Sequence, residues 1–139
     1  MKEPITRSRF SIRSRRRSLG HALAGLRDML ITEPNAWLHA TATVLVLVLC
    51  WCFHVDQKGF ALIVVAIVMV WVAEAFNTVL EIMMDFVSSQ QYSPIIKRAK
   101  DISAAAVLIA SIGAVAIGVA VLGHSLWNSH STFFRVYLK

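Results

Sequence analysis

Three long apolar stretches constrain the fold of this 139-residue chain more than any other feature. They cover residues 36–55, 60–87 and 102–122, and short polar segments separate them. About twenty apolar residues in a helix are enough to cross a hydrocarbon core of ~30 Å. Hydrophobic residues make up 57% of the chain and charged residues only 16%, which is not the composition of a soluble domain. The sequence therefore predicts an all-α integral membrane protein with three transmembrane helices.

The segments outside these stretches predict membrane-surface structure. Residues 1–17 form a basic N-terminal tail without apolar periodicity. Ser18 is expected to cap an amphipathic surface helix over residues 18–31, because leucine, alanine and methionine recur there at helical spacing. Pro34 is expected to end this helix, since the residue before a proline avoids helical geometry. Residues 123–139 are rich in aromatic side chains, which predicts an interfacial C-terminal tail.

Positive charge is distributed unevenly and predicts the orientation in the membrane. Eight of the fourteen Lys and Arg residues lie within the first 27 positions, and three more lie between the second and third apolar stretches. Cytoplasmic loops carry such an excess of basic residues, so we expect the N-terminus inside and the C-terminus outside. A basic tail beside apolar spans favours contact with anionic lipid. Nucleic acid is not expected as a partner, because no aromatic reading motif accompanies the charge.

The second apolar stretch contains acidic residues that hydrocarbon penalises. The segment EAFNTVLEIMMD runs from Glu74 to Asp85. At 100° per residue, Glu74, Thr78, Glu81 and Asp85 fall on one narrow stripe, with Asn77 at its edge. One interpretation is that these residues simply hold neighbouring helices together through buried hydrogen bonds. Three acids on one stripe are more typical of a functional site inside a membrane.

The predicted topology brings further charged residues to the cytoplasmic level of this stripe. Glu33, Lys100 and Asp101 are expected there, while Glu74 lies about two turns deeper than Glu81. Carboxylates hold Mg²⁺ together with phosphate oxygens, and basic groups counter phosphate charge. A more deeply buried carboxylate is suited to act as a general base. Together these features predict phosphoryl transfer to a lipid alcohol at the cytoplasmic interface.

The same segments resemble a known family. EAFNTVLEIMMD fits the pattern E-x-x-N-[ST]-x-x-E-x-x-x-D, and AKDISAAAVLIAS and ALAGLRDMLITEPNAWLH resemble two further regions of the prokaryotic diacylglycerol kinase and undecaprenol kinase family. The resemblance covers residues 18–122, which we expect to form the membrane lipid-kinase domain. It implies a lipid kinase of the bacterial inner membrane, usually a homotrimeric helix bundle, that uses ATP and Mg²⁺. The lack of a phosphate-binding G-x-x-x-x-G-K-[ST] motif agrees with such an enzyme.

The resemblance also implies a role for each matching residue. Glu74 corresponds to the catalytic base that takes the proton from the lipid hydroxyl. Glu33 and Glu81 correspond to the ligands of the Mg²⁺ that accompanies ATP. The other expected nucleotide contacts are Asn77, Asp85, Lys100, Asp101, Arg13 and Arg15. Apart from the resemblance, Trp71 lies one turn before Glu74, so Trp71, Glu74 and Thr78 are the residues expected to line a groove for the lipid substrate.

The chain departs from the family pattern at two places. Tyr92-Ser93-Pro94 stands where the family usually has Tyr-His-Pro or Tyr-His-Glu, which puts the nucleotide-side role of that histidine in doubt. Pro34 replaces an arginine that is frequent in the turn before the first span. His39 matches a histidine of the undecaprenol branch, where a packing hydrogen bond and a substrate role are both open.

The segments TEPNAWLH and AKDISAAAVLIASIGAVAIG resemble the undecaprenol branch more than the diacylglycerol branch. We therefore expect undecaprenol as the lipid alcohol and undecaprenyl phosphate as the product. A diacylglycerol kinase that makes phosphatidic acid is the alternative. A small ion-coupled transporter would also carry acids in a span, but it should have polar residues in the other spans. An inactive assembly subunit is the third class, and only the missing loop histidine supports it.

Overall fold

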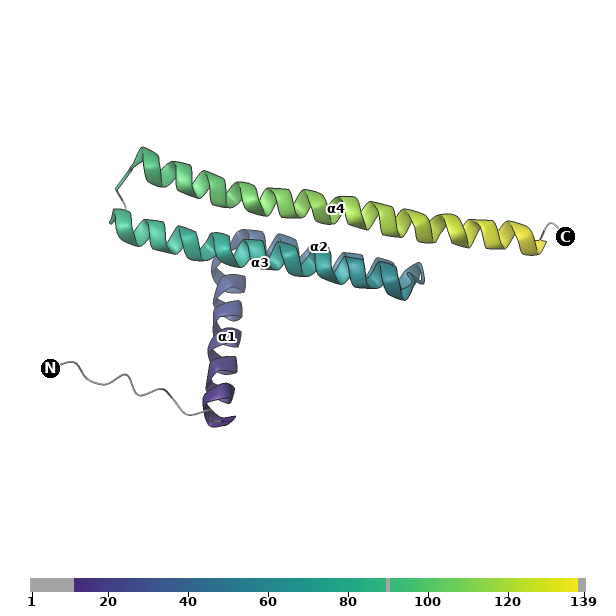
Figure 1. The fold of residues 1–139 in the computed structure, drawn as a ribbon, viewed down its shortest axis with the longest axis horizontal. Helices are drawn as coiled ribbons and strands as arrows, with labels where there is room; N and C mark the ends of the chain where they lie inside the picture. Colours follow the sequence, from purple (N-terminus) through teal and green to yellow (C-terminus); the bar gives the residue numbers. More distant parts are fainter. Residues whose placement is uncertain (1–11, 90, 138–139) are drawn as a thin grey trace.

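The computed structural model describes residues 12–89 and 91–137, with side chains described as far as Trp127. The described part is all-α and contains the helices α1 (Ile12–Thr32), α2 (Pro34–Cys52), α3 (Gln57–Ser88) and α4 (Pro94–Tyr137). Figure 1 shows α2, α3 and α4 side by side, with α1 standing roughly perpendicular to them. α2, α3 and α4 are each long and apolar enough to cross a membrane. This architecture confirms the predicted all-α membrane fold with three spans.

A single residue separates the surface helix from the first span. Glu33 has extended backbone geometry, with φ −101° and ψ 113°, and Pro34 begins α2. Proline disfavours helical geometry at the residue before it and fits the first helical position. The chain therefore turns sharply at Glu33, as Figure 1 shows. This turn holds the Glu33 carboxylate at the start of the bundle.

The turn between α2 and α3 is closed by a helix cap and a glycine. Asp56 caps α3 by accepting a hydrogen bond from the backbone N–H of Gly59 at 3.0 Å. Gly59 is buried, and a Cβ there would lie 2.8 Å from the Cγ1 atom of Val121. Only glycine therefore allows α3 and α4 to approach so closely at this end.

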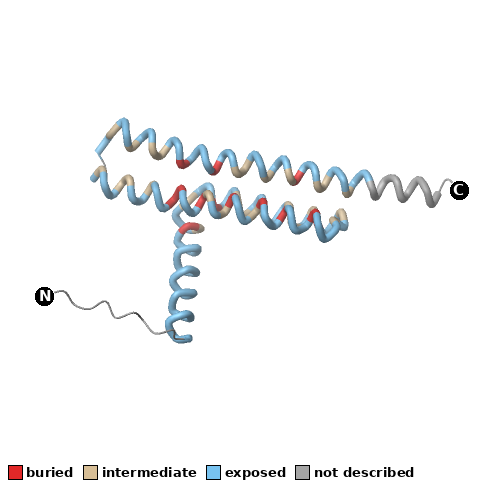
Figure 2. The backbone as a smooth tube through the Cα atoms, in the orientation of Figure 1, coloured by how far each residue is buried: buried red, intermediate tan, exposed pale blue. Residues whose placement is uncertain are grey.

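The core lies on one face of α3. Its buried residues recur every three or four positions, which is the spacing of one helical face; they are Gly59, Ile63, Ala66, Val70, Glu74, Asn77 and Thr78. Figure 2 shows these buried positions along α3, where it faces its neighbours. Large apolar side chains on the other faces of α2, α3 and α4 stay exposed in the single chain. This pattern suits helices in which lipid or other chains cover the outer surface.

Two helices extend further than the sequence patterns predict. α1 begins at Ile12, and the expected capping residue Ser18 lies inside it, where its hydroxyl donates to the backbone oxygen of Ser14. α4 runs from Pro94 to Tyr137 and includes residues expected in a loop and in a C-terminal tail. Pro94 starts the helix, and no later proline interrupts it. At 1.5 Å per residue α4 is ~66 Å long, more than a hydrocarbon core requires.

Candidate functional site

The acidic stripe of α3 faces the interior of the helix bundle. Glu74 is 1% exposed, Asn77 is 5% exposed and Thr78 is 7% exposed. Glu81 and Asp85, nearer the end of α3, are half-buried. The stripe from Glu74 to Asp85 runs ~16 Å along the helix. The predicted polar face is thus the face that packs against α2 and α4.

Glu74 is the most deeply buried charged side chain in the described part of the chain. Neither of its carboxylate oxygens has a hydrogen-bond partner among the described residues. The Nε2 atom of His39 on α2 lies 3.6 Å from the Oε2 atom of Glu74. The charges of Glu33 and Glu81 disfavour the ionised form of Glu74. The fold therefore gathers three of the predicted carboxylates and His39 at one place.

A hydrogen-bonded group follows on the next turn of α3. The Asn77 amide nitrogen donates to the Oε1 atom of Glu81 at 3.0 Å. The hydroxyl of Ser103 on α4 donates to the Oδ1 atom of Asn77 at 2.6 Å and also lies 2.9 Å from the backbone oxygen of Lys100. Asn77 thereby connects α4 to the Glu81 carboxylate and fixes the orientation of that carboxylate.

Lys100 and Asp101 are neighbours in sequence but face different ways. The Lys100 ammonium forms an ion pair with Asp85 of α3, and both side chains are half-buried. Asp101 instead pairs with Lys97 at 2.6 Å, one turn earlier on α4, and both of these side chains are 61% exposed. Lys100 and Asp85 therefore belong to the polar cluster, whereas Asp101 lies on the outer face of α4.

The residues expected to contact lipid have different surroundings. The indole N–H of Trp71 donates to the Thr43 hydroxyl of α2 at 3.1 Å, so its polar edge is bound between helices. The Thr78 hydroxyl is buried and, like the Glu74 oxygens, has no hydrogen-bond partner among the described residues. Buried polar atoms are nearly always paired in native proteins. The unsatisfied atoms of Glu74 and Thr78 lie one turn apart, which makes this place a candidate binding site for a polar group.

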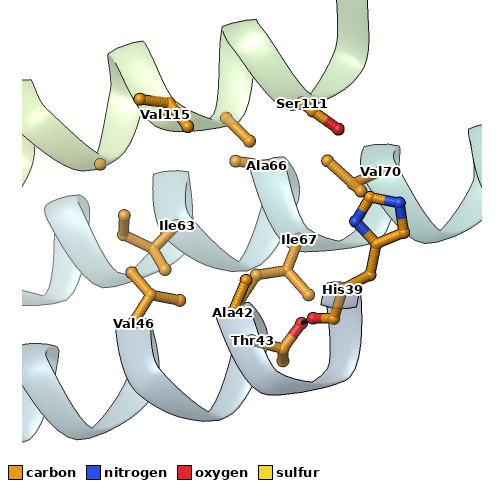
Figure 3. Close-up of a pocket in the computed structure, with 12 residues that line it drawn as sticks. His39, Ala42, Thr43, Val46, Ile63, Ala66, Ile67, Val70, Ser111 and Val115 are labelled. Carbon is orange, nitrogen blue, oxygen red and sulfur yellow. Dashed lines mark hydrogen bonds between the residues drawn. The ribbon is translucent and has the colours of Figure 1, made fainter. Parts of the chain in front are cut away.

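A cavity of about 200 Å³ lies between α2, α3 and α4 beside this place. His39 and Thr43 of α2 and Ser111 of α4 line it, and the rest of its wall is Ala, Val, Ile and Gly. Figure 3 shows the imidazole of His39 pointing from α2 toward Val70 of α3. The cavity is thus apolar along most of its wall, with His39 connecting it to Glu74. A hydrocarbon chain fits this lining.

The basic residues near the N-terminus lie away from this cluster within one chain. Arg13 and Arg15 occupy the first turn of α1, at the end opposite its junction with α2 (Figure 1). Arg15 lies eighteen positions before Glu33, which corresponds to ~27 Å along the helix axis. The single chain therefore does not bring either arginine to the expected nucleotide site.

The described residues hold no group of three or more His, Cys, Asp or Glu side chains arranged to bind a metal ion. Glu33 and Glu81 are nevertheless half-buried carboxylates whose charges act on the same residue, Glu74. Mg²⁺ is commonly bound through one or two carboxylates, with phosphate oxygens and water completing its shell. The chemistry of these two side chains therefore fits Mg²⁺ bound together with a phosphate.

Two polar residues of the site were not predicted as site residues from the sequence. Ser103 lies one turn after Lys100, in the same AKDIS segment, and this spacing is the signal that places both on the face toward α3. Thr43 lies one turn after His39 on α2 and bonds to Trp71. Which residue each hydroxyl contacts depends on how α2 and α4 pack against α3. The sequence pattern alone does not specify this packing.

Comparison with known proteins identifies the family of this chain. Residues 20–122 match the family described as prokaryotic diacylglycerol kinase. The diacylglycerol kinase of Synechocystis sp. is 32% identical over 105 residues, which is 76% of this chain and 60% of that protein. The diacylglycerol kinase of Escherichia coli K12 is 34% identical over 100 residues, or 71% of this chain and 80% of that protein.

The chain belongs to the prokaryotic diacylglycerol kinase family. This confirms the family that the acidic stripe and the AKD segment predicted. The family match contains the whole polar cluster from Glu33 to Ser103, whereas Arg13 and Arg15 lie before it. The chain therefore spans about three fifths of the length of the Synechocystis relative. In this diacylglycerol kinase family member, the loop position expected to carry a histidine holds Ser93, whose backbone oxygen accepts from Lys97 at the start of α4.

Proposed function

We propose that the protein is a kinase that transfers the γ-phosphoryl group of ATP to the hydroxyl of a membrane lipid alcohol. The observation that carries this proposal is the buried Glu74 carboxylate, which has no hydrogen-bond partner among the described residues and lies beside an apolar cavity between three membrane helices. A soluble substrate would not require a base at this depth. The names of the relatives, which are diacylglycerol kinases, support a lipid acceptor.

Each step of the transfer has a candidate residue in this chain. Glu74 would take the proton from the lipid hydroxyl, and the resulting oxygen would attack the γ-phosphorus as the bond to ADP breaks. Asn77 would hold the Glu81 carboxylate in position through its hydrogen bond. Lys100 would exchange its ion pair with Asp85 for phosphate oxygens.

We propose Mg²⁺ as the metal, with Glu33 and Glu81 as its protein ligands. Their carboxylates are hard oxygen donors, which Mg²⁺ prefers, and both are near Glu74. When bound, the ion neutralises charge on the phosphates of ATP. The two carboxylates alone repel the nucleotide, so this arrangement requires a cation between them and ATP.

Two lipid alcohols are candidates for the acceptor. The TEPNAWLH and AKDIS segments resemble the undecaprenol branch, which favours undecaprenol and the product undecaprenyl phosphate. The relatives' names favour diacylglycerol and the product phosphatidic acid. An ion-coupled transporter is disfavoured because the cavity beside Glu74 is lined mostly by apolar side chains. An ion path would need polar groups along its length.

We further propose a homotrimer in the bacterial inner membrane, with the N-terminus and the site on the cytoplasmic side. The family resemblance supports the trimer, and the apolar outer faces of α2, α3 and α4 would be covered by neighbouring chains and lipid. The cytoplasmic orientation rests on the concentration of basic residues before α2 and around the start of α4.

The deciding experiment is a phosphoryl-transfer assay. Purified full-length protein in detergent would be given γ-³²P-labelled ATP and Mg²⁺, with undecaprenol and diacylglycerol in separate reactions. Labelled lipid in the undecaprenol reaction alone would select that acceptor, and label in the diacylglycerol reaction alone would select the other. No labelled lipid with either alcohol, in protein shown to be folded, would reject the kinase proposal.

A further inference from the structure

A general base must be aimed at its substrate, yet no hydrogen bond within the described residues holds the carboxylate of Glu74. The base proposed above therefore needs a group that orients it. The side chain placed for this task is His39 of α2, whose Nε2 atom lies 3.6 Å from the Glu74 Oε2 atom. That separation is slightly longer than a hydrogen bond. Contacts of catalytic groups often shorten when the substrate binds.

We infer that His39 is the positioning residue for Glu74. In this arrangement the imidazole Nε2–H donates to the Oε2 atom of Glu74. The Oε1 atom is left to take the proton from the lipid hydroxyl. This inference rests on the proposed function of Glu74 as the base. It adds a residue that acts through Glu74 and has no contact with the phosphates.

The fold holds His39 in place through a hydrogen-bonded connection between α2 and α3. The Thr43 hydroxyl donates to the backbone oxygen of His39 at 2.7 Å and accepts from the Trp71 indole N–H at 3.1 Å. Trp71 lies one turn before Glu74 on α3. Adjacent turns of α2 and α3 therefore make two contacts. One joins Thr43 to Trp71, and the other joins His39 to Glu74.

The charges around Glu74 also favour this role. Glu33, from the turn before α2, and Glu81, from α3, both act on Glu74 as like charges. On α4, the Lys100 ammonium is engaged by Asp85, and Ser103 binds Asn77. His39 supplies the ring nitrogen that lies 3.6 Å from the Glu74 Oε2 atom, so it is a hydrogen-bond donor within reach of this carboxylate. Its removal would leave the Glu74 carboxylate surrounded by repulsion and free to turn.

The position of the ring places His39 next to the substrate as well. Its side chain is 12% exposed and forms part of the wall of the apolar cavity (Figure 3). A lipid whose hydroxyl reaches Glu74 would pass this ring. His39 could therefore affect lipid binding alone, and a test must separate that effect from an effect on the base.

The test compares His39→Leu, which removes the donor but keeps an apolar side chain of moderate size, with His39→Gln, which places an amide donor near the position of Nε2. We expect His39→Leu to lower kcat about 10- to 100-fold, the loss of one hydrogen bond to a charged group, with little change in KM for ATP. His39→Gln should restore much of kcat. His54→Asn is the matched control, because His54 is exposed in the α2–α3 turn and its positive φ of 50° suits asparagine.

Wild-type kcat in His39→Leu would overturn the inference, and so would a rise in lipid KM with kcat unchanged. Equal losses of kcat in His39→Leu and His39→Gln would also overturn it, since a packing role gives that result. Size-exclusion profiles and thermal unfolding in detergent would show that the variants fold. Absence of lipid phosphorylation by the wild-type protein would instead reject the proposed function, so the two failures are distinguishable.

Discussion

At the scale of single residues, Glu74 combines deep burial with unpaired oxygens. Glu74→Gln keeps the size of the side chain and removes its basicity. We expect kcat for lipid phosphorylation to fall about 100-fold or more, in the range of general-base catalysis. The fold should persist, because the carboxylate makes no hydrogen bond in the described part of the chain.

The control for this change is Asp28→Asn, which converts an exposed carboxylate of α1 to an amide outside the polar cluster. It should leave kcat unchanged. The measurement is labelled phosphate incorporated into the accepted lipid, at saturating ATP and lipid. Full activity in Glu74→Gln would refute the base assignment while leaving family membership intact.

A second residue-scale prediction concerns the nucleotide side of the site. Lys100 is half-buried and paired with Asp85, whereas Arg98 on the same helix is exposed. Lys100→Met should raise KM for ATP about tenfold or more, because a charge-assisted contact to phosphate is lost. Arg98→Met should have little effect. Equal KM values for ATP in the two variants would contradict the assignment of Lys100 to the phosphates.

At the scale of helices, the close approach of α3 and α4 depends on Gly59. A methyl group there would lie 2.8 Å from Val121 and 2.9 Å from the side chains of Val55 and Asp56. Gly59→Ala should therefore lower the free energy of unfolding by about 1–3 kcal/mol. Gly113→Ala on α4 is the matched control, because nothing lies within 4 Å of its added Cβ. Unfolding of both variants in detergent would be followed by circular dichroism, and equal stabilities would contradict the proposed contact.

The helices also show which features of the fold could be predicted from the sequence alone. The apolar spans, the break at Pro34 and the inward stripe of Glu74, Asn77 and Thr78 were predictable, because each depends on local spacing along one helix. The start of α1 and the end of α4 were not, since no strong breaker marks either boundary in the sequence. Contacts between helices, such as Ser103 with Asn77, depend on how α4 rotates against α3 and require the three-dimensional packing.

At the scale of the whole molecule, one chain places its polar atoms inward and most of its apolar side chains outward. Glu74, Asn77, Thr78 and Ser103 are the buried polar residues among those described. Exposed apolar residues cover the outer faces of all three membrane-spanning helices. This reverses the pattern of a soluble protein and is the arrangement that a bilayer or neighbouring chains would stabilise. α1 stands roughly perpendicular to the three long helices (Figure 1).

The orientation of the whole molecule gives the last prediction. The basic residues before α2 and around the start of α4 should hold both segments in the cytoplasm, because translocating them would oppose the positive-inside bias. Alkaline phosphatase fused after Lys139 should therefore be active in intact cells, while the same enzyme fused after Ser88 should be inactive. Green fluorescent protein at the same two positions should give the opposite pattern. Active phosphatase at Ser88 would place the end of α3, and with it Glu81 and Asp85, outside the cell and away from cytoplasmic ATP.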